Sequence, residues 1–284
     1  MGESIPTKRD RVAVLLYGLC GSSLELRYFA RRMRQRGFRV VVPTLTGYGA
    51  LETETTLEST QPSFQRWIAE AAIEIDRLAE AHAEVNLCGV SLGATLALAV
   101  AAERPTKLDA LSLISTTLFF DGWNVSRWRR LLPLAYYTPL GHLYRYRATP
   151  PYGVKNERVR AEIARTLERE WPTSKRAFSI PSKRLLQADR LIRHVIASLG
   201  RVRTPTLMIH SREDDVASLA NVRFVRKHIG TDMFREVIVE DSYSMITLDN
   251  DCDYAASKTA YFFDTAAKQR DEAALVVSQS MSVQ

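Results

Sequence analysis

Cysteine, histidine and long apolar runs are scarce in this sequence. There are three cysteines and five histidines among 284 residues, and the spacing of the cysteines fits no zinc motif. An odd, sparse set of cysteines without a secretory leader is typical of reduced thiols, which indicates a cytoplasmic protein. The longest apolar stretch, around Ala94–Ala102, is far too short to span a bilayer. We therefore expect a cytoplasmic chain with no transmembrane segment, no metal and no cofactor.

The excess of positive charge lies in the middle of the chain. Residues 121–200 hold sixteen Lys and Arg against six Asp and Glu, whereas the remainder is slightly acidic. Nine of the chain's Phe, Trp and Tyr residues also lie within 119–152. Arginines interleaved with aromatic rings can bind single-stranded nucleic acid, but no nucleic-acid-binding fold accompanies them, so we expect no nucleic-acid partner. The segment is interpreted as a recognition element for a small substrate or an acidic partner.

Short aliphatic runs alternate with stretches of helical periodicity along most of the chain. The runs, bounded by Gly or Pro, predict buried strands, and apolar residues at helical spacing predict helices between them. This alternation is typical of an α/β fold with a doubly wound, mostly parallel sheet covered on both faces. The expected strands are Val12–Leu16, Phe38–Val42, Val85–Val90, Leu111–Ser115, Leu207–His210 and Glu236–Val239, and the expected helices are 22–37, 62–78, 94–102, 219–228 and 254–265.

The alternation stops between Thr116 and Val202. This stretch contains no convincing core strand, and it carries two charged amphipathic helices near Glu157–Glu170 and Lys183–Leu199. We predict that residues 1–115 and 203–268 form the α/β core, that residues 116–202 form an inserted, helical, basic and aromatic-rich cap, and that residues 269–284 form a flexible tail.

A G-x-S-x-G motif, Gly89–Gly93, lies between a predicted strand and a predicted helix. In this context it is typical of a nucleophile elbow, a sharp turn that exposes the oxygen of Ser91 at the edge of a sheet. The backbone N–H of Leu92, and that of Leu19 in the glycine turn after the first strand, are then the expected donors of an oxyanion hole. The alternative is a chance match in a glycine turn, against which the flanking strand and helix argue.

With these motifs the sequence resembles the α/β-hydrolase superfamily, and within it the branch of small esterases, monoacylglycerol lipases and serine-aminopeptidase-like proteins. The resemblance extends from Val12 to about Phe263 and implies an α/β-hydrolase fold with a cap inserted above the nucleophile. Its signs are the glycine loop Tyr17–Gly21, the Pro-x-x-x-Gly-x-Gly stretch Pro43–Gly49, the elbow Gly89–Gly93, the insertion, and the strand-end segment His210–Val216.

The resemblance also implies the acid of a catalytic triad. In this branch the acid follows a strand in the pattern His-Gly-x-x-Asp-x-Val, and Asp214 occupies that place. Asp215 is the neighbouring and less favoured choice. The alternative for Asp214 is a helix N-cap or loop acid with no part in catalysis.

The most informative departure from the branch concerns the base. A histidine is expected after the last strand, in a pattern like Asp-Ser-x-His, but residues 241–244 read Asp-Ser-Tyr-Ser. A serine hydroxyl cannot accept a proton near neutral pH as imidazole does. We therefore expect a degraded triad of Ser91, Asp214 and Ser244. Residue 244 carries either a deliberate inactivating substitution or a natural divergence, and the intact Ser91 favours divergence.

None of the five histidines has the spacing expected of a replacement base. His210 ends a predicted strand and is interpreted as a structural group. His142 belongs to the insertion and is the one histidine that could reach over the pocket. The other three are His82 and His228 at predicted helix ends and His194 in the insertion.

The substrate pocket is expected to include residues from the glycine loop and from the aromatic stretch. Tyr17 stands where the branch often has histidine, and Cys20 follows it, although a lone thiol is more often inert packing than a nucleophile. Phe119 and Trp123 begin the aromatic stretch, whose rings either line a lid or pack the cap on the sheet. Such a lid suits a hydrophobic or aromatic acyl substrate, and its positive charge suits a carboxylate, a phosphate or an acidic carrier protein.

Three functions remain open at this point. The first is a carboxylesterase- or thioesterase-like serine hydrolase with weak general activity because its triad is degraded. The second is a non-hydrolytic biosynthetic enzyme that transfers an acyl group, closes a ring or rearranges its substrate. The third is a non-catalytic protein that binds a ligand in the same pocket.

Overall fold

A single parallel sheet forms the centre of the molecule. The computed structural model describes residues 10–49, 63–125, 145–147, 150–170 and 179–281. The sheet has the strand order β2-β1-β3-β4-β7-β8, with every neighbouring pair parallel, so the predicted α/β architecture is confirmed. The strands are β1 (Arg11–Leu16), β2 (Arg39–Val41), β3 (Glu84–Val90), β4 (Ala110–Ile114), β7 (Thr206–Ser211) and β8 (Phe234–Val239).

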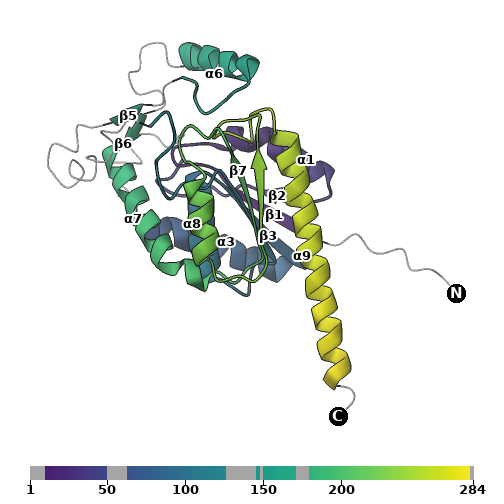
Figure 1. Cartoon of the computed structure of the whole chain (residues 1–284). Coiled ribbons are helices and arrows are strands. Elements are labelled where there is room, and N and C mark those ends of the chain that lie inside the picture. The colour runs from purple at the N-terminus through teal and green to yellow at the C-terminus, as the bar shows by residue number, and fades with distance from the viewer. Residues whose placement is uncertain (1–9, 50–62, 126–144, 148–149, 171–178, 282–284) are drawn as a thin grey trace.

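Helices cover both faces of this sheet (Figure 1). Because the central strands are covered on both sides, they are mostly apolar, and β3 is buried at every position, including Glu84 and Asn86. Helix α4 follows β3 and is buried from Leu92 to Ala102, which explains its lack of a polar face. Helices α1 (Arg27–Gln35) and α9 (Cys252–Met281) pack together on one face, and α3 (Phe64–Ala81), α4 (Leu92–Glu103), α7 (Ser182–Ser198) and α8 (Ala220–His228) lie on the other.

The strand order and register bring the functional loops to one edge. The chain runs from β1 outward to β2 and then returns to the other side of β1 with β3, which creates the switch point where parallel sheets bind ligands. Leu16 at the end of β1 lies opposite Gly89, and Val90 at the end of β3 lies opposite Ile114. The loops that follow β1, β3 and β4 therefore begin at the same level of the sheet.

The insertion between β4 and β7 contributes to two parts of the fold. Helix α6 (Glu157–Glu170) lies beyond the edge of the sheet (Figure 1), whereas α7 packs along α3 and α4 as part of the helical layer. A short antiparallel pair, β5 (Arg145–Arg147) with β6 (Ser179–Pro181), joins the segments on either side of α6. Three-residue strands are too short to produce a period-two pattern, so the sequence did not predict them.

Helix α9 is longer than the sequence pattern predicted. It runs from Cys252 to Met281, through much of the segment expected to be a tail. No Gly or Pro interrupts these residues, and Ala, Glu, Gln and Lys favour continuation of the helix. Among the described residues, no helix combines the length and the apolar character needed to cross a membrane.

Candidate active site

Ser91 lies in the strained turn that the elbow motif predicted. Its backbone has φ 54° and ψ −122° at the junction of β3 and α4. The two flanking glycines are required by close packing: a Cβ on Gly89 would lie 2.5 Å from the Cα of Ala94, and a Cβ on Gly93 would overlap the carbonyl oxygens of Leu16 and Tyr17. The turn therefore places the Ser91 side chain at the carboxyl edge of the sheet, beside the N-terminus of α4.

The loop after β1 lies next to this serine. A Cβ on Gly18 would lie 3.6 Å from the Cβ of Ser91, which shows how closely the loop approaches the elbow. Cys20 has a left-handed φ of 58°, and its N–H donates to the carbonyl of Tyr48 at 2.9 Å. Gly18, the residue before Leu19, thus lies against the elbow that carries Leu92. The role of the Leu19 and Leu92 N–H groups as oxyanion donors stays a prediction.

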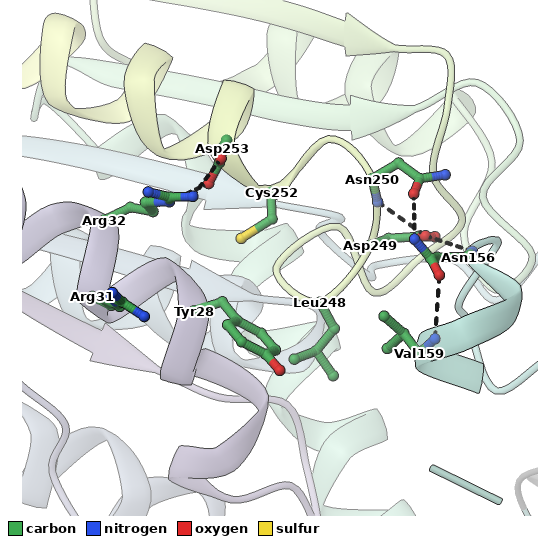
Figure 2. Close-up of a pocket in the computed structure, with 10 residues that line it drawn as sticks. All are labelled: Tyr28, Arg31, Arg32, Asn156, Val159, Leu248, Asp249, Asn250, Cys252 and Asp253. Carbon is green, nitrogen blue, oxygen red and sulfur yellow. Dashed lines mark hydrogen bonds and ion pairs between the residues drawn. The ribbon is translucent and has the colours of Figure 1, made fainter. Parts of the chain in front are cut away.

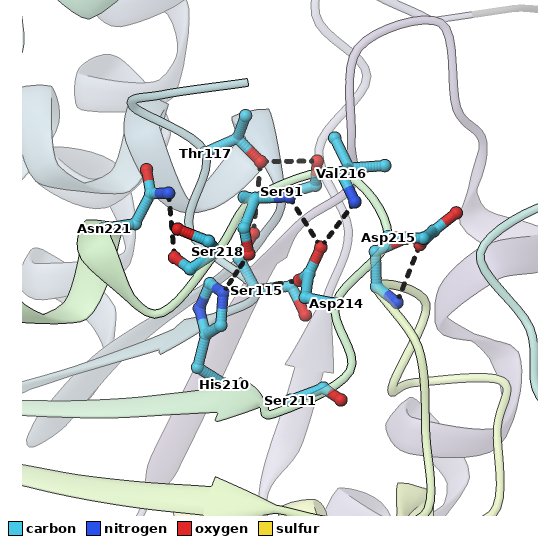
Figure 3. A network of polar contacts seen from close by, with 12 residues as sticks. Ser91, Ser115, Thr117, His210, Ser211, Asp214, Asp215, Val216, Ser218 and Asn221 are labelled. Atoms are coloured by element: carbon cyan, nitrogen blue, oxygen red, sulfur yellow. Dashed lines mark hydrogen bonds and ion pairs between the residues drawn. The ribbon is translucent and has the colours of Figure 1, made fainter. Parts of the chain in front are cut away.

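The hydroxyl of Ser91 has a hydroxyl partner. Its Oγ lies 3.3 Å from Thr117 Oγ1, and Thr117 in turn donates to the carbonyl of Ser115 at 3.2 Å (Figure 3). Neither partner can accept and keep a proton near neutral pH. The contact orients the serine and does not activate it. Thr117 was not singled out from the sequence, because a threonine after a strand carries no distinguishing signal.

Asp214 is buried, and its contacts are local. Its Oδ1 accepts the N–H groups of Val216 and Ala217 at 2.8 and 2.7 Å, and its Oδ2 lies 3.4 Å from Nε2 of His210. Burial raises the pKa of Asp214 to about 7, against the lowering effect of the two N–H groups. His210 is also buried, with Nε2 2.6 Å from the Ala217 carbonyl, and burial lowers its pKa. His210 is therefore a packed, neutral group that holds the turn.

Ser244 contacts the other acid, Asp215. Its Oγ donates to Asp215 Oδ1 at 2.6 Å, and its N–H donates to the same oxygen at 3.2 Å. Both residues are buried. Figure 3 shows the carboxylates of Asp214 and Asp215 pointing in different directions from adjacent positions of the turn. The structure thus brings Ser244 together with the acid that the sequence pattern favoured less, while the assignment of Asp214 as the triad acid stays a prediction.

Gly153 of the insertion lies against Ser244, the position where the sequence resemblance implies a histidine. It has φ 73°, and a Cβ at this position would lie 2.5 Å from Ser244 Oγ. The N–H of Met245 donates to the Gly153 carbonyl at 2.8 Å. Asp249 strengthens this connection, because it accepts the N–H groups of Lys155, Asn156 and Tyr243 at 2.6, 2.8 and 3.0 Å. The segment Gly153–Asn156, in the middle of the insertion, is therefore fixed onto the loop that carries Ser244.

The four expected pocket residues do not share one environment. Tyr17 is buried, with its hydroxyl beside Gly49, and Cys20 is half-buried. Phe119 packs edge-to-face on Phe224 of α8. Trp123 is 59% exposed; it stacks edge-to-face on Tyr243, and its indole N–H donates to the Glu213 carbonyl at 3.0 Å. Trp123 thus lies over the acid and base loops, and its place in a substrate pocket stays a prediction.

Some sequence predictions fall outside the described residues. These are Trp128, Tyr136, Tyr137 and Tyr144 of the aromatic stretch, the arginines 127, 129 and 130, and His142. Of the remaining histidines, His194 packs against Phe64, and Nδ1 of His228 donates to the Phe224 carbonyl at 2.8 Å within α8. Nδ1 of His82 lies 2.8 Å from Asp10 Oδ2. Within the described part of the chain, no group of three His, Cys, Asp or Glu side chains is arranged to hold a metal ion.

A separate groove of about 320 Å³ lies between α1, the start of α6 and the start of α9 (Figure 2). Tyr28, Arg31 and Arg32 line one side, and Asn156, Asp249 and Cys252 line the other. Arg32 is ion-paired with Asp253 within it. None of the predicted site residues lines this groove.

The parallel sheet, the strained serine at its edge and the insertion after β4 define the α/β-hydrolase class, in its esterase and monoacylglycerol-lipase branch. The model of the serine aminopeptidase S33 family matches residues 7–251, and the chain belongs to this family. The resemblance seen in the sequence is therefore confirmed.

Individual relatives agree with this assignment. A thermostable monoacylglycerol lipase from Bacillus sp. strain H-257 is 26% identical over 250 residues, covering 88% of this chain and 89% of the relative. A carboxylesterase from Bacillus subtilis is 21% identical, covering 86% and 88%. A soluble variant of monoglyceride lipase from Saccharomyces cerevisiae has the same fold, with a TM-score of 0.71 at 9% identity, covering 93% of this chain and 89% of that one.

Proposed function

We propose that this protein is an acyl-directed serine hydrolase whose general activity is weak because its base has been replaced. Ser91 is the nucleophile, and the N–H groups of Leu19 and Leu92 stabilise the oxyanion. The observation that carries the proposal is the strained backbone of Ser91, which is kept beside the glycine loop. Strain of this kind costs about 1–3 kcal/mol and persists where function requires it.

The substrate class follows from the relatives and from the insertion. The relatives include a monoacylglycerol lipase and a carboxylesterase, which favours an ester or thioester of a hydrophobic acyl chain. Positive charge in residues 121–200 favours a substrate that also carries a carboxylate or phosphate. An acidic carrier protein that presents such a thioester is a proposed partner. Cys20, Cys88 and Cys252 form no disulfide, which supports a cytoplasmic location.

The acid and base positions form the degraded part of the site. Asp214 is the acid by its place in the family pattern, and Ser244, bound to Asp215, occupies the base position. Loss of the histidine from a serine protease triad costs about 10⁶ in turnover, with the residual rate supplied by binding and the oxyanion hole. Ordinary esters should therefore be hydrolysed slowly.

The surroundings of Ser244, at the position of the missing base, also favour two other functions. Ser244 is buried, bound to Asp215 and covered by Gly153, so no water is activated there by a basic group. An enzyme that transfers, cyclises or rearranges an acyl substrate gains from this, because water competes poorly. A protein that only binds its ligand has no need of a base at all.

Labelling of Ser91 by a fluorophosphonate probe tests the proposal. We expect slow labelling of the wild type, mapped to Ser91 by mass spectrometry, and a rate at least about tenfold lower for Ser91→Ala, because oxyanion donors accelerate attack even without a base. Ser23→Ala, at a nearby exposed serine, serves as the control and should label like the wild type. Equal labelling of wild type and Ser91→Ala would exclude a nucleophilic serine and would leave the binding function.

A further inference from the structure

Glu25 lies directly behind the loop after β1. It belongs to the short 3-10 helix η1 (Ser23–Leu26) that follows the loop. A Cβ on Gly21 would lie 2.5 Å from Glu25 Oε1, and a Cβ on Gly18 would lie 3.8 Å from Glu25 Oε2 and 3.6 Å from the Cβ of Ser91. Gly18 therefore lies between the Glu25 carboxylate and Ser91. Because Gly21 has no side chain, it leaves the space that the carboxylate occupies.

Two backbone N–H groups lie near this carboxylate and lower its pKa. One belongs to Ser22 and is the contact expected of a capping box, in which Glu at the third helical position reaches back to the N-cap. The other belongs to Gly18, which lies outside the helix and next to Leu19. A cap alone does not require the second contact. Glu25 therefore holds both ends of the oxyanion loop.

The Glu25 carboxyl changes its ionisation state near neutral pH because of its surroundings. Burial raises the pKa of Glu25 to about 7, in spite of the two N–H donors. Tyr48 interacts electrostatically with Glu25, Tyr17 and Cys20, so these four titratable groups form one cluster. A buried cation, Arg184 of α7, lies behind them and donates to Cys20 Sγ at 3.0 Å and to the Gly49 carbonyl at 2.8 Å.

We propose that Glu25 is a positioning residue for the oxyanion hole, whose ionised carboxylate holds the N–H groups of Gly18 and Ser22 and thereby fixes the Leu19 N–H toward the acyl oxygen on Ser91. The inference rests on the proposed function. A protonated carboxyl keeps one strong acceptor oxygen, so protonation releases one of the two N–H groups. The hole is complete when Glu25 is ionised.

The ratio of labelling rates, wild type to Glu25→Gln, tests this inference across pH 5.5–9. The ratio cancels the effect of hydroxide on the serine and on the probe. We expect a ratio near one at pH 5.5, where both side chains are neutral, and about ten above pH 8, with a midpoint near 7, because a displaced donor costs tenfold or more. Gly21→Ala should behave as Glu25→Gln does, since its methyl group displaces the carboxylate.

Asp109→Asn is the matched control, because Asp109 is also a half-buried carboxylate that accepts a backbone N–H, from Val85 at 2.7 Å, at the start of β3. Its ratio should not change with pH. A pH-independent ratio for Glu25→Gln, in protein shown to be folded by thermal unfolding, would overturn the inference.

Amide hydrogen exchange separates this inference from the proposed function. If the probe does not label the wild type at any pH, the proposed function fails, and exchange of residues 17–26 still reports on the loop. We then expect severalfold slower exchange in the wild type than in Glu25→Gln at pH 8, and equal exchange at pH 5.5. Equal exchange at both pH values would overturn the role of Glu25.

Discussion

Ser91 adopts a left-handed backbone conformation, which a non-glycine residue reaches at a cost. The G-x-S-x-G spacing between a predicted strand and a predicted helix was sufficient to predict it. The partner of Ser244 was not predictable in the same way. Asp214 and Asp215 are adjacent, and which carboxylate faces Ser244 depends on how the turn is held by Val216, Ala217 and His210 in three dimensions.

The buried carboxyl of Asp214 predicts a pH dependence of stability. Its pKa of about 7 in the folded protein exceeds its unfolded value of 3.8, so the folded state binds the proton more tightly. The contribution of Asp214 to stability is fully present below about pH 4 and is lost as pH rises to 7. Asp214→Asn does not ionise, and its melting temperature relative to the wild type should therefore rise between pH 5 and pH 8.

Asp232→Asn provides the control for that measurement, because Asp232 is exposed. Its melting temperature relative to the wild type should be the same at both pH values. An equal difference for Asp214→Asn at pH 5 and pH 8 would contradict the assignment of a raised pKa.

Among the elements, the segment from Gly153 to Asn156 connects the insertion to the active site. The periodicity of the sequence was sufficient to predict every strand of the sheet and the main helices, because buried strands and amphipathic helices differ in period. It was not sufficient to predict this connection. The contacts of Asp249 with Lys155 and Asn156 join residues more than ninety positions apart, and no local pattern encodes them.

Substitution of Gly153 tests whether this connection stabilises the fold. Gly153→Ala places a Cβ 2.5 Å from Ser244 Oγ and requires a positive φ of a residue with a side chain. We expect a loss of about 1–2 kcal/mol in the free energy of unfolding, measured by urea titration. Gly200→Ala meets only an ordinary contact at 3.8 Å and should change stability far less. Equal losses for the two variants would show that Gly153 is not constrained.

At the scale of the whole molecule, the net positive charge belongs to one segment of the chain. The basic excess of residues 121–200 belongs to an insertion whose α7 packs into the helical layer and whose central segment at Gly153 lies against Ser244. What this charge recognises stays a proposal. The family and the fold were predictable from motifs spread along the chain, whereas the closed base position depends on contacts between distant segments.

The central claim is that the site is complete for acyl chemistry except for its base. Two variants restore an imidazole. Ser244→His supplies it directly, although Gly153 must move to admit the ring. Ser244→Gly leaves space beside Gly153, so that imidazole added to the solution can enter without movement of Gly153. Asp214→Asn and Asp215→Asn, each added to Ser244→His, identify the acid by which of them removes the gain.

The rate at which a fluorophosphonate labels Ser91 in these variants is the most direct test. The account predicts that Ser244→His labels at least about a hundredfold faster than the wild type, or that imidazole accelerates labelling of Ser244→Gly in a saturable way, because a general base contributes 10²–10⁴-fold. Ser91→Ala should show neither effect. Labelling that is no faster than wild type in both variants, with both shown to be folded, would contradict the claim.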